Sequence, residues 1–151
     1  MLKRLEGSRF VVYLDAAGLP TIGIGHLLTQ DERSSGKLWD GREWVSFRNG
    51  LSEEQITNLL AHDLNSFEDT VCNLLSGYGL KQHQYDALIS FAFNVGAYAF
   101  RKSTLVKRIK QNRMGDVPDQ FRRWKYSSGK VVQGLINRRE VEIKMWLGEY
   151  E

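Results

Sequence analysis

Residues 10–26 read FVVYLDAAGLPTIGIGH, and this stretch decides the fold that the sequence predicts. The β-branched and aromatic residues at positions 10–14 are typical of a strand, and residues 15–18 (DAAG) supply turn formers. A second strand is expected around residues 21–24, with its alternation carried on to His26. The sequence therefore predicts a β-hairpin near the N-terminus.

Alternation along the second strand divides its side chains between two faces. Thr21, Gly23 and Gly25 would share one face, and Ile22, Ile24 and His26 the other. Each glycine weakens a strand by roughly 0.5–1 kcal/mol relative to alanine. Two glycines on one face are therefore expected where a bulky ligand, such as a carbohydrate chain, lies against the backbone. A β-bulge is the structural alternative.

From Leu51 onward the pattern becomes helical. Residues 52–55 (SEEQ) form a capping box, and Leu51 and Ile56 occupy the positions of a hydrophobic staple around it. Apolar residues then recur at three- and four-residue spacing, which predicts one long amphipathic helix; they are Ile56, Leu59, Leu60, Leu64, Phe67, Val71 and Leu75. Gly77 and Gly79 are expected to end it.

Further helices are predicted at Gln82–Val95, at Ser103–Asn112, from about Asp116 with Pro118, and at about 131–147; a short one is expected at Met1–Glu6. Residues 30–50, which include Trp39, Trp44 and Phe47, fit no clear pattern. The predicted fold class is α+β and mostly helical, within a single domain of residues 1–151. A β-rich lobe at about 9–50 would be joined by a linking helix at about 52–76 to a helical lobe at about 80–148.

Composition is typical of a globular protein, with 42% hydrophobic and 26% charged residues. No apolar run approaches the roughly 18 residues that a membrane span needs. The net charge is +3, but residues 101–144 carry 13 basic and 4 acidic side chains. Such a basic region fits either a polyanionic partner or a solvated helical surface. Cys72 is the one cysteine and the three histidines show no ligand spacing, so no metal or organic cofactor is expected.

Two carboxylates near the predicted hairpin suggest glycoside hydrolysis. That reaction needs one carboxylic acid to protonate the leaving oxygen and an ionised carboxylate on the opposite face. Glu6 at a helix C-terminus would resist ionisation, whereas Asp15 in a solvated turn would stay charged. Thr21 could hydrogen-bond a water beside Asp15. Acidic residues are common, however, so this spacing alone leaves a glycosidase as one of several possibilities.

The same segment closely resembles the phage lysozyme family. The matching residues are Glu6-Gly7, Tyr13-Leu14-Asp15, Gly18 and Thr21-Ile22-Gly23-Ile24-Gly25-His26. The family's catalytic Glu, Asp and Thr are spaced by nine and six residues, as Glu6, Asp15 and Thr21 are. The resemblance extends to residues 90–96, 103–105 and 134–139, with Trp124 and Glu142.

This resemblance implies hydrolysis of the β-1,4 bond between N-acetylmuramic acid and N-acetylglucosamine in bacterial peptidoglycan. Glu6 would be the general acid, and Asp15 with Thr21 would position and activate the attacking water. Leu27, Phe93, Asn94 and Ser103 match positions that line the glycan, and Arg138 is expected near Glu6. A core role for Phe93 is equally open. His26 and Asp63 match a family ion pair, which is interpreted here as structural.

Two other functions remain open at this stage. A lytic transglycosylase would use one acid and no water-activating partner. A non-catalytic module would bind wall polymers or nucleic acid through the basic region 101–144, although no nucleic-acid partner is expected from the resemblance. The protein is expected to be a monomer that stays in the host cytoplasm until its release to the cell wall, with an export or anchor segment preceding this sequence as in some relatives.

Overall fold

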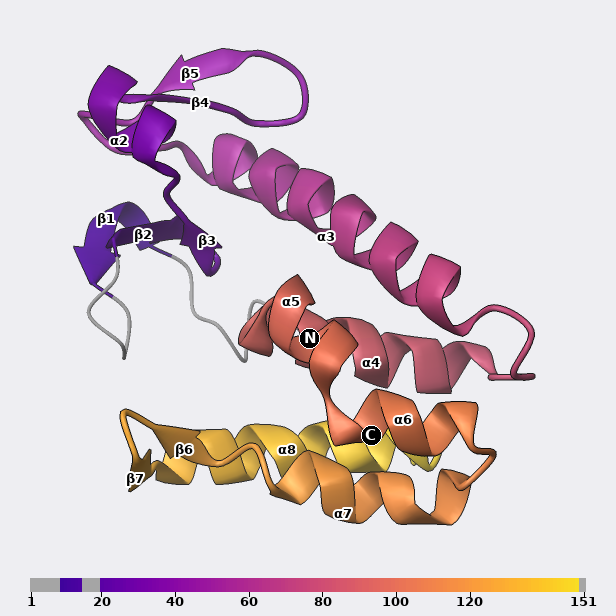
Figure 1. The fold of residues 1–151 in the computed structure, drawn as a ribbon. Coiled ribbons are helices and arrows are strands. Elements are labelled where there is room, and N and C mark those ends of the chain that lie inside the picture. The colour runs from indigo at the N-terminus through magenta and orange to yellow at the C-terminus, as the bar shows by residue number, and fades with distance from the viewer. Residues whose placement is uncertain (1–8, 15–19, 150–151) are drawn as a thin grey trace. The chain divides into compact units, whose positions relative to one another are not determined.

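The computed structural model describes residues 9–14 and 20–149 (Figure 1). The chain divides into two compact units, residues 1–65 and residues 66–151, and the boundary falls inside the longest helix. The predicted helix at Met1–Glu6 lies outside the described residues. Elements are numbered as in Figure 1, and each unit is described by itself.

A three-stranded antiparallel sheet opens the first unit. It consists of β1 (Arg9–Leu14), β2 (Pro20–Gly23) and β3 (His26–Leu27), in the order β1-β2-β3. Thr21 pairs with Tyr13 on one side and with Leu27 on the other. The hairpin predicted from residues 10–24 is thus confirmed, and Thr21 occupies its central strand.

The second predicted strand, however, does not continue to His26. Gly23 and Gly25 adopt φ values of 66° and 72°, in the left-handed region that favours glycine, and the chain turns back between β2 and β3. A Cβ on Gly23 would lie 3.7 Å from the side chains of Ile56 and Leu59. Gly23 therefore faces the core, and the prediction of one continuous alternating strand to His26 was wrong because both glycines adopt turn conformations. A ligand contact at Gly25 stays a prediction.

The unassigned segment 30–50 folds into a helix and a second hairpin. These are α2 (Gln30–Ser35), β4 (Lys37–Trp39) and β5 (Trp44–Ser46), with β4 and β5 antiparallel. One face of the hairpin is buried through Leu38 and Val45. The core of this unit is built from buried apolar side chains of β2, β4, β5, the helix that follows and the loops between them, whereas α2 contributes none; they are Ile22, Ile24, Leu28, Leu38, Val45, Phe47, Leu51, Ile56 and Leu59.

Helix α3 (Glu53–Leu75) begins at the predicted capping box. The amide of Gln55 donates to the Ser52 hydroxyl at 3.1 Å, and the amide of Ser52 donates to the Gln55 side chain at 2.9 Å. Ile56 and Leu59 belong to the core of the first unit, whereas Val71 and Leu75 belong to that of the second. The long helix predicted from periodicity is confirmed.

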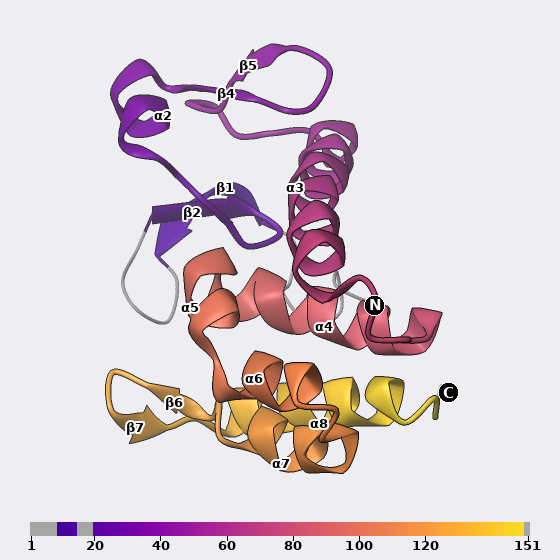
Figure 2. The same ribbon diagram turned by 45° about the vertical axis from the view of Figure 1, so that its right-hand side comes forward.

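The second unit is helical. Its elements are α4 (Gln82–Val95), α5 (Ala97–Lys102), α6 (Thr104–Lys110), η1 (Met114–Asp116), α7 (Val117–Arg122), β6 (Tyr126–Ser127), β7 (Lys130–Val131) and α8 (Gln133–Trp146). Helix α8 packs against α4 and α7 (Figure 2). The predicted bounds of α4 are confirmed, while the last helix starts later than expected because residues 130–131 pair with 126–127.

Phe91 of α4 lies at the centre of the second core. Its ring makes edge contacts with Phe100, Phe121 and Trp124, at centroid distances of 5.3–6.1 Å. Such aromatic pairs contribute beyond the area that they bury. The confirmed antiparallel hairpin and the helical remainder make the fold α+β. Among the described residues, no helix has the length and apolar character needed to cross a membrane.

Replacing Gly23 by alanine is expected to destabilise the first unit. The added Cβ has room at 3.7 Å, but φ of 66° costs an L-residue roughly 1–2 kcal/mol. Urea unfolding should show a loss of that size in the free energy of unfolding. Gly134→Ala in α8 is the matched control, because an added Cβ there would have no atom within 4 Å. An equal loss in both variants would contradict the turn assignment.

Candidate active site

The two predicted catalytic carboxylates, Glu6 and Asp15, lie outside the described residues. Along the chain, Glu6 precedes β1 by three residues and Asp15 directly follows its last residue, Leu14. Thr21 is described: it lies on β2, is 1% exposed and has Tyr13 as its partner on β1. The structure therefore fixes the third predicted site residue on the strand that follows Asp15.

Leu27 is the predicted glycan-lining residue that lies beside Thr21. The two are partners in the register of β2 and β3, and the side chain of Leu27 is 49% exposed. The sheet thus brings together one buried hydroxyl residue and one exposed apolar residue that the sequence assigned to the site. Their proximity follows from the turn at Gly23 and Gly25, where a continuous strand was predicted.

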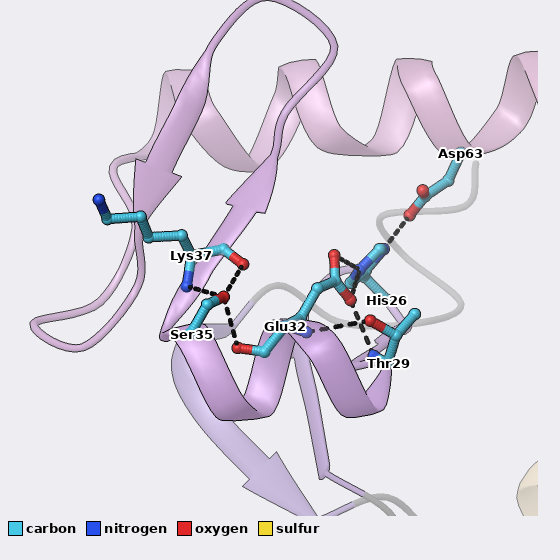
Figure 3. Close-up of polar contacts among 6 residues, drawn as sticks. All are labelled: His26, Thr29, Glu32, Ser35, Lys37 and Asp63. Atoms are coloured by element: carbon cyan, nitrogen blue, oxygen red, sulfur yellow. Dashed lines mark hydrogen bonds and ion pairs between the residues drawn. The ribbon is translucent and has the colours of Figure 1, made fainter.

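His26, the first residue of β3, is held between two carboxylates (Figure 3). Its Nδ1 lies 2.7 Å from an oxygen of Asp63 on α3, and its Nε2 lies 3.1 Å from both carboxylate oxygens of Glu32 on α2. Asp63 was expected as a structural partner, and this pair is confirmed. Glu32 was missed by the sequence analysis, although Thr29 and Glu32 have the spacing of a capping box.

The charges around His26 raise its pKa. Burial by itself would lower the pKa, but the hydrogen bond and charge of Asp63, together with those of Glu32, outweigh burial and raise the pKa above its ordinary value. Glu32 also accepts the backbone N–H of Thr29 at 2.8 Å, which closes the capping box of α2. The His26 side chain therefore links β3, α2 and α3.

A buried ionic cluster ties α4 to α8 in the second unit. Glu142 is fully buried; its Oε1 lies 2.8 Å from Nε of Arg139, and its Oε2 accepts from Ser90 at 2.6 Å and from Arg138 at 3.3 Å. Burial raises the pKa of Glu142, an effect that the two arginines and Ser90 oppose. Breaking such a buried pair would leave an uncompensated charge.

Arg138 was predicted to lie near Glu6 at the substrate site. Arg138 is 4% exposed, and its guanidinium donates to the backbone carbonyl of Ser90 at 3.0 Å, besides its contact with Glu142. The structure thus places Arg138 in the cluster between α4 and α8. Its role toward a substrate stays a prediction.

Asn94, at the end of α4, is oriented by Arg139. Nη2 of Arg139 donates to Oδ1 of Asn94 at 2.7 Å. A guanidinium can only donate, so the carboxamide oxygen faces Arg139 and the amide nitrogen supplies the remaining donors.

The neighbouring Phe93 is 9% exposed and packs edge-on against Phe67 at 5.4 Å. Phe93 therefore makes a contact in the core, which is one of the two roles expected for it; the glycan contact stays a prediction.

Ser103 begins α6 as its N-cap. Its hydroxyl donates to the carbonyl of Phe100 at 2.7 Å and accepts the amide of Val106 at 3.2 Å. The side chain is 4% exposed. Ser103 therefore has a structural role in addition to the glycan contact predicted for it.

Across the part of the chain that the structure describes, no three His, Cys, Asp or Glu side chains gather as a metal site would require.

Replacing Asp63 by asparagine is expected to destabilise the protein in a pH-dependent way. Because the folded pKa of His26 is raised, its stabilising contribution is fully present below the unfolded pKa of about 6.5 and is lost as pH rises through the folded value. The loss should be about 1.5–3 kcal/mol near pH 5.5 and smaller near pH 9, measured by urea unfolding at both pH values.

Glu53→Gln provides the control for this prediction, since Glu53 lies in the exposed first turn of α3 and is remote in sequence from His26. It should show no comparable change between the two pH values. An NMR titration of His26 would contradict the assignment if its pKa were at or below the ordinary value.

Comparison with known proteins identifies the family. The phage lysozyme family model matches residues 3–142. The chain is 37% identical to the endolysin of Salmonella phage P22 over 146 residues, covering 97% of this chain and 92% of that one. It is 36% identical to a SAR-endolysin of Bacteriophage PS119, covering 91% of this chain and 74% of that one.

Solved structures agree with this result. The fold is similar to that of a variant of P22 lysozyme, with a TM-score of 0.70, 35% identity, and coverage of 97% of this chain and 92% of that one. The family-model match over residues 3–142 includes the long helix and most of α8, and it spans the positions of Glu6, Asp15 and Thr21. The chain belongs to the phage lysozyme family of lytic glycosidases.

Proposed function

We propose that this protein is a muramidase that hydrolyses the β-1,4 bond between N-acetylmuramic acid and N-acetylglucosamine, with Glu6 as general acid. The observation that carries the proposal is the family match over residues 3–142, which contains Glu6, Asp15 and Thr21 at the family's spacings of nine and six. The substrate implied by the family is peptidoglycan.

The chemistry divides between the two carboxyl groups. Glu6 gives its proton to the glycosidic oxygen as the bond to the anomeric carbon breaks, and water attacks that carbon. Asp15 takes a proton from this water, and Thr21 holds the water in place. If the reaction inverts the anomeric centre, the two carboxyl groups need a separation of roughly 6.5–9.5 Å.

Thr21 suits a positioning role because its backbone is held on both sides. It lies on the central strand of the sheet, paired with Tyr13 and Leu27, and it follows residues 15–19 closely in the chain. Leu27, Phe93, Asn94 and Ser103 are proposed to contact the glycan, and Arg138 to act near Glu6. The orientation of Asn94 by Arg139 supports this for one of them, since its amide donors suit the carbonyl oxygen of an N-acetyl group.

The names of the relatives, endolysin and SAR-endolysin, fit release to the cell wall. We propose that the protein stays in the host cytoplasm until that release and acts as a monomer on the wall.

Glu6→Gln is expected to lower the rate of peptidoglycan hydrolysis by about 10²–10⁴-fold, because the variant cannot deliver the proton. The measurement is the loss of turbidity of outer-membrane-permeabilised bacteria. Glu43→Gln is a suitable control, because Glu43 is an exposed residue of the β4–β5 turn. A Glu6→Gln variant within about threefold of the wild type would remove Glu6 from this role.

Asp15→Asn distinguishes hydrolysis from transglycosylation. A hydrolase needs Asp15 to activate water, so the variant should lose activity by a comparable factor, and wild-type digests should carry reducing ends in mass spectra of the muropeptides. An active Asp15→Asn variant together with 1,6-anhydro ends would show a lytic transglycosylase instead.

A further inference from the structure

Two of the four tryptophans lie side by side on an exposed face of the β4–β5 hairpin. Trp39 and Trp44 are direct partners in the strand register, with ring centroids 5.7 Å apart and an edge-to-face angle of 66°. Trp39 is 38% exposed and Trp44 is 67% exposed. Tryptophan is highly buried on average, so an exposed pair of this kind indicates a surface that meets a partner.

The hairpin holds this pair in a defined position. Leu38 and Val45, on the opposite face, are buried in the core of the first unit. In the turn, Oδ1 of the buried Asp40 accepts the amides of Arg42 and Glu43, both at 2.9 Å. The two indoles are therefore presented from an anchored scaffold, which limits the entropy lost on binding.

The turn is also anchored to helix α3. A Cβ on Gly41 would lie 3.1 Å from Cβ of His62, so the backbone of the turn passes close to the helix. The missing Cβ of Gly41 leaves room for this approach, and its φ of 98° lies in the region that favours glycine. Displacement of the hairpin from the first unit would therefore have to break contacts at its turn as well as in its core.

Polar groups border the two indoles on the same face. Lys37 precedes Trp39 by two residues on β4, and Ser46 is the partner of Lys37 on β5. Alternation therefore places Lys37 and Ser46 on the same face as the two tryptophans. The side chain of Lys37 extends away from the contacts around Ser35 (Figure 3). Arg48 is exposed just beyond β5 and donates to the carbonyl of Ser35 at 3.2 Å.

From this arrangement we infer that the face formed by Lys37, Trp39, Trp44 and Ser46 is a second glycan-binding surface, which holds a peptidoglycan strand apart from the bond being cleaved. A pyranose ring has an apolar face of C–H groups and a polar rim. An indole can stack on the apolar face of the sugar, while hydroxyl and ammonium groups hydrogen-bond its polar rim. The inference rests on the proposed function for the identity of the glycan.

The charges near the pair favour a peptidoglycan strand over a lipid surface. Lys37 and Arg48 suit the carboxylates of the peptide stems. An anionic bilayer, however, would also meet the exposed carboxylate of Glu43, which directly precedes Trp44. The face also has only two apolar side chains, which is little for insertion between lipids.

Binding of catalytically unaltered protein to purified peptidoglycan sacculi at low temperature tests this inference. Trp44→Val keeps a β-branched residue on the strand but removes the indole, and it is expected to weaken binding about tenfold. Trp44→Tyr retains an aromatic face and should stay within about threefold of the wild type. Tyr98→Ala is the matched control: Tyr98 is 75% exposed, is a single aromatic beneath Lys102, and lies on α5 in the second unit.

Three outcomes would overturn the inference: unchanged binding by Trp44→Val, an equal loss in Tyr98→Ala, or wild-type binding to phosphatidylglycerol vesicles but not to sacculi. The wild type gives an independent readout if Trp44→Val fails to fold. On titration with a soluble N-acetylglucosamine oligosaccharide, the indole N–H signals of Trp39 and Trp44 should shift in NMR spectra, and unchanged signals would also overturn it.

This experiment separates the inference from the proposed function. Sacculus binding does not require catalysis, so an active Glu6→Gln variant would refute the proposed catalytic role without restoring the binding of Trp44→Val. Conversely, wild-type binding by Trp44→Val alongside an inactive Glu6→Gln variant would refute only the second glycan surface.

Discussion

The first unit depends on one imidazole held between two carboxylates. His26 lies at the start of β3, directly after the turn that follows Thr21 and its strand, and it contacts Asp63 of α3 and Glu32 of α2. Since these contacts are partly buried, loss of either carboxylate would leave the protonated form of His26 less well compensated. The position of the strand that carries Thr21 is therefore coupled to charges on two helices.

The same carboxylate links the sheet to the hairpin that carries the tryptophans. Glu32 closes the capping box of α2, and α2 ends at Gly36 in the left-handed conformation. The carbonyl of Gly36 then accepts the amide of Phe47, just beyond β5. A continuous series of hydrogen bonds thus runs from His26 to the β4–β5 hairpin. Strand β2, which carries Thr21, and the proposed second glycan surface are consequently connected through His26 and Glu32 within the first unit.

Sequence patterns predicted the elements whose signals are local. The capping box at Ser52 and Gln55 needs only four residues, and the helix at 82–95 shows its own periodicity and glycine stop. The strand through Gly23 and Gly25 was predicted wrongly, because alternation cannot reveal the φ values that turn the chain there. The hairpin at 37–46 was missed, since its short strands each bury a single residue and become recognisable only when paired.

The residues around the proposed site show the same division between local and long-range information. The spacing of Glu6, Asp15 and Thr21 is a property of the chain and needs no coordinates, whereas the burial of Glu142 and Arg139 depends on α4 packing against α8. Charged residues on a helix ordinarily indicate a solvated face. Here Arg139 is enclosed, and its guanidinium lies 5.1 Å from the ring centroid of Phe91 and donates to Asn94. One side chain therefore both packs in the core and orients Asn94, a residue proposed to bind the glycan. Selection of an N-acetyl carbonyl by Asn94 would then follow from packing in the second core, because the same guanidinium that fills that core binds the carboxamide oxygen and leaves both amide donors to the other side.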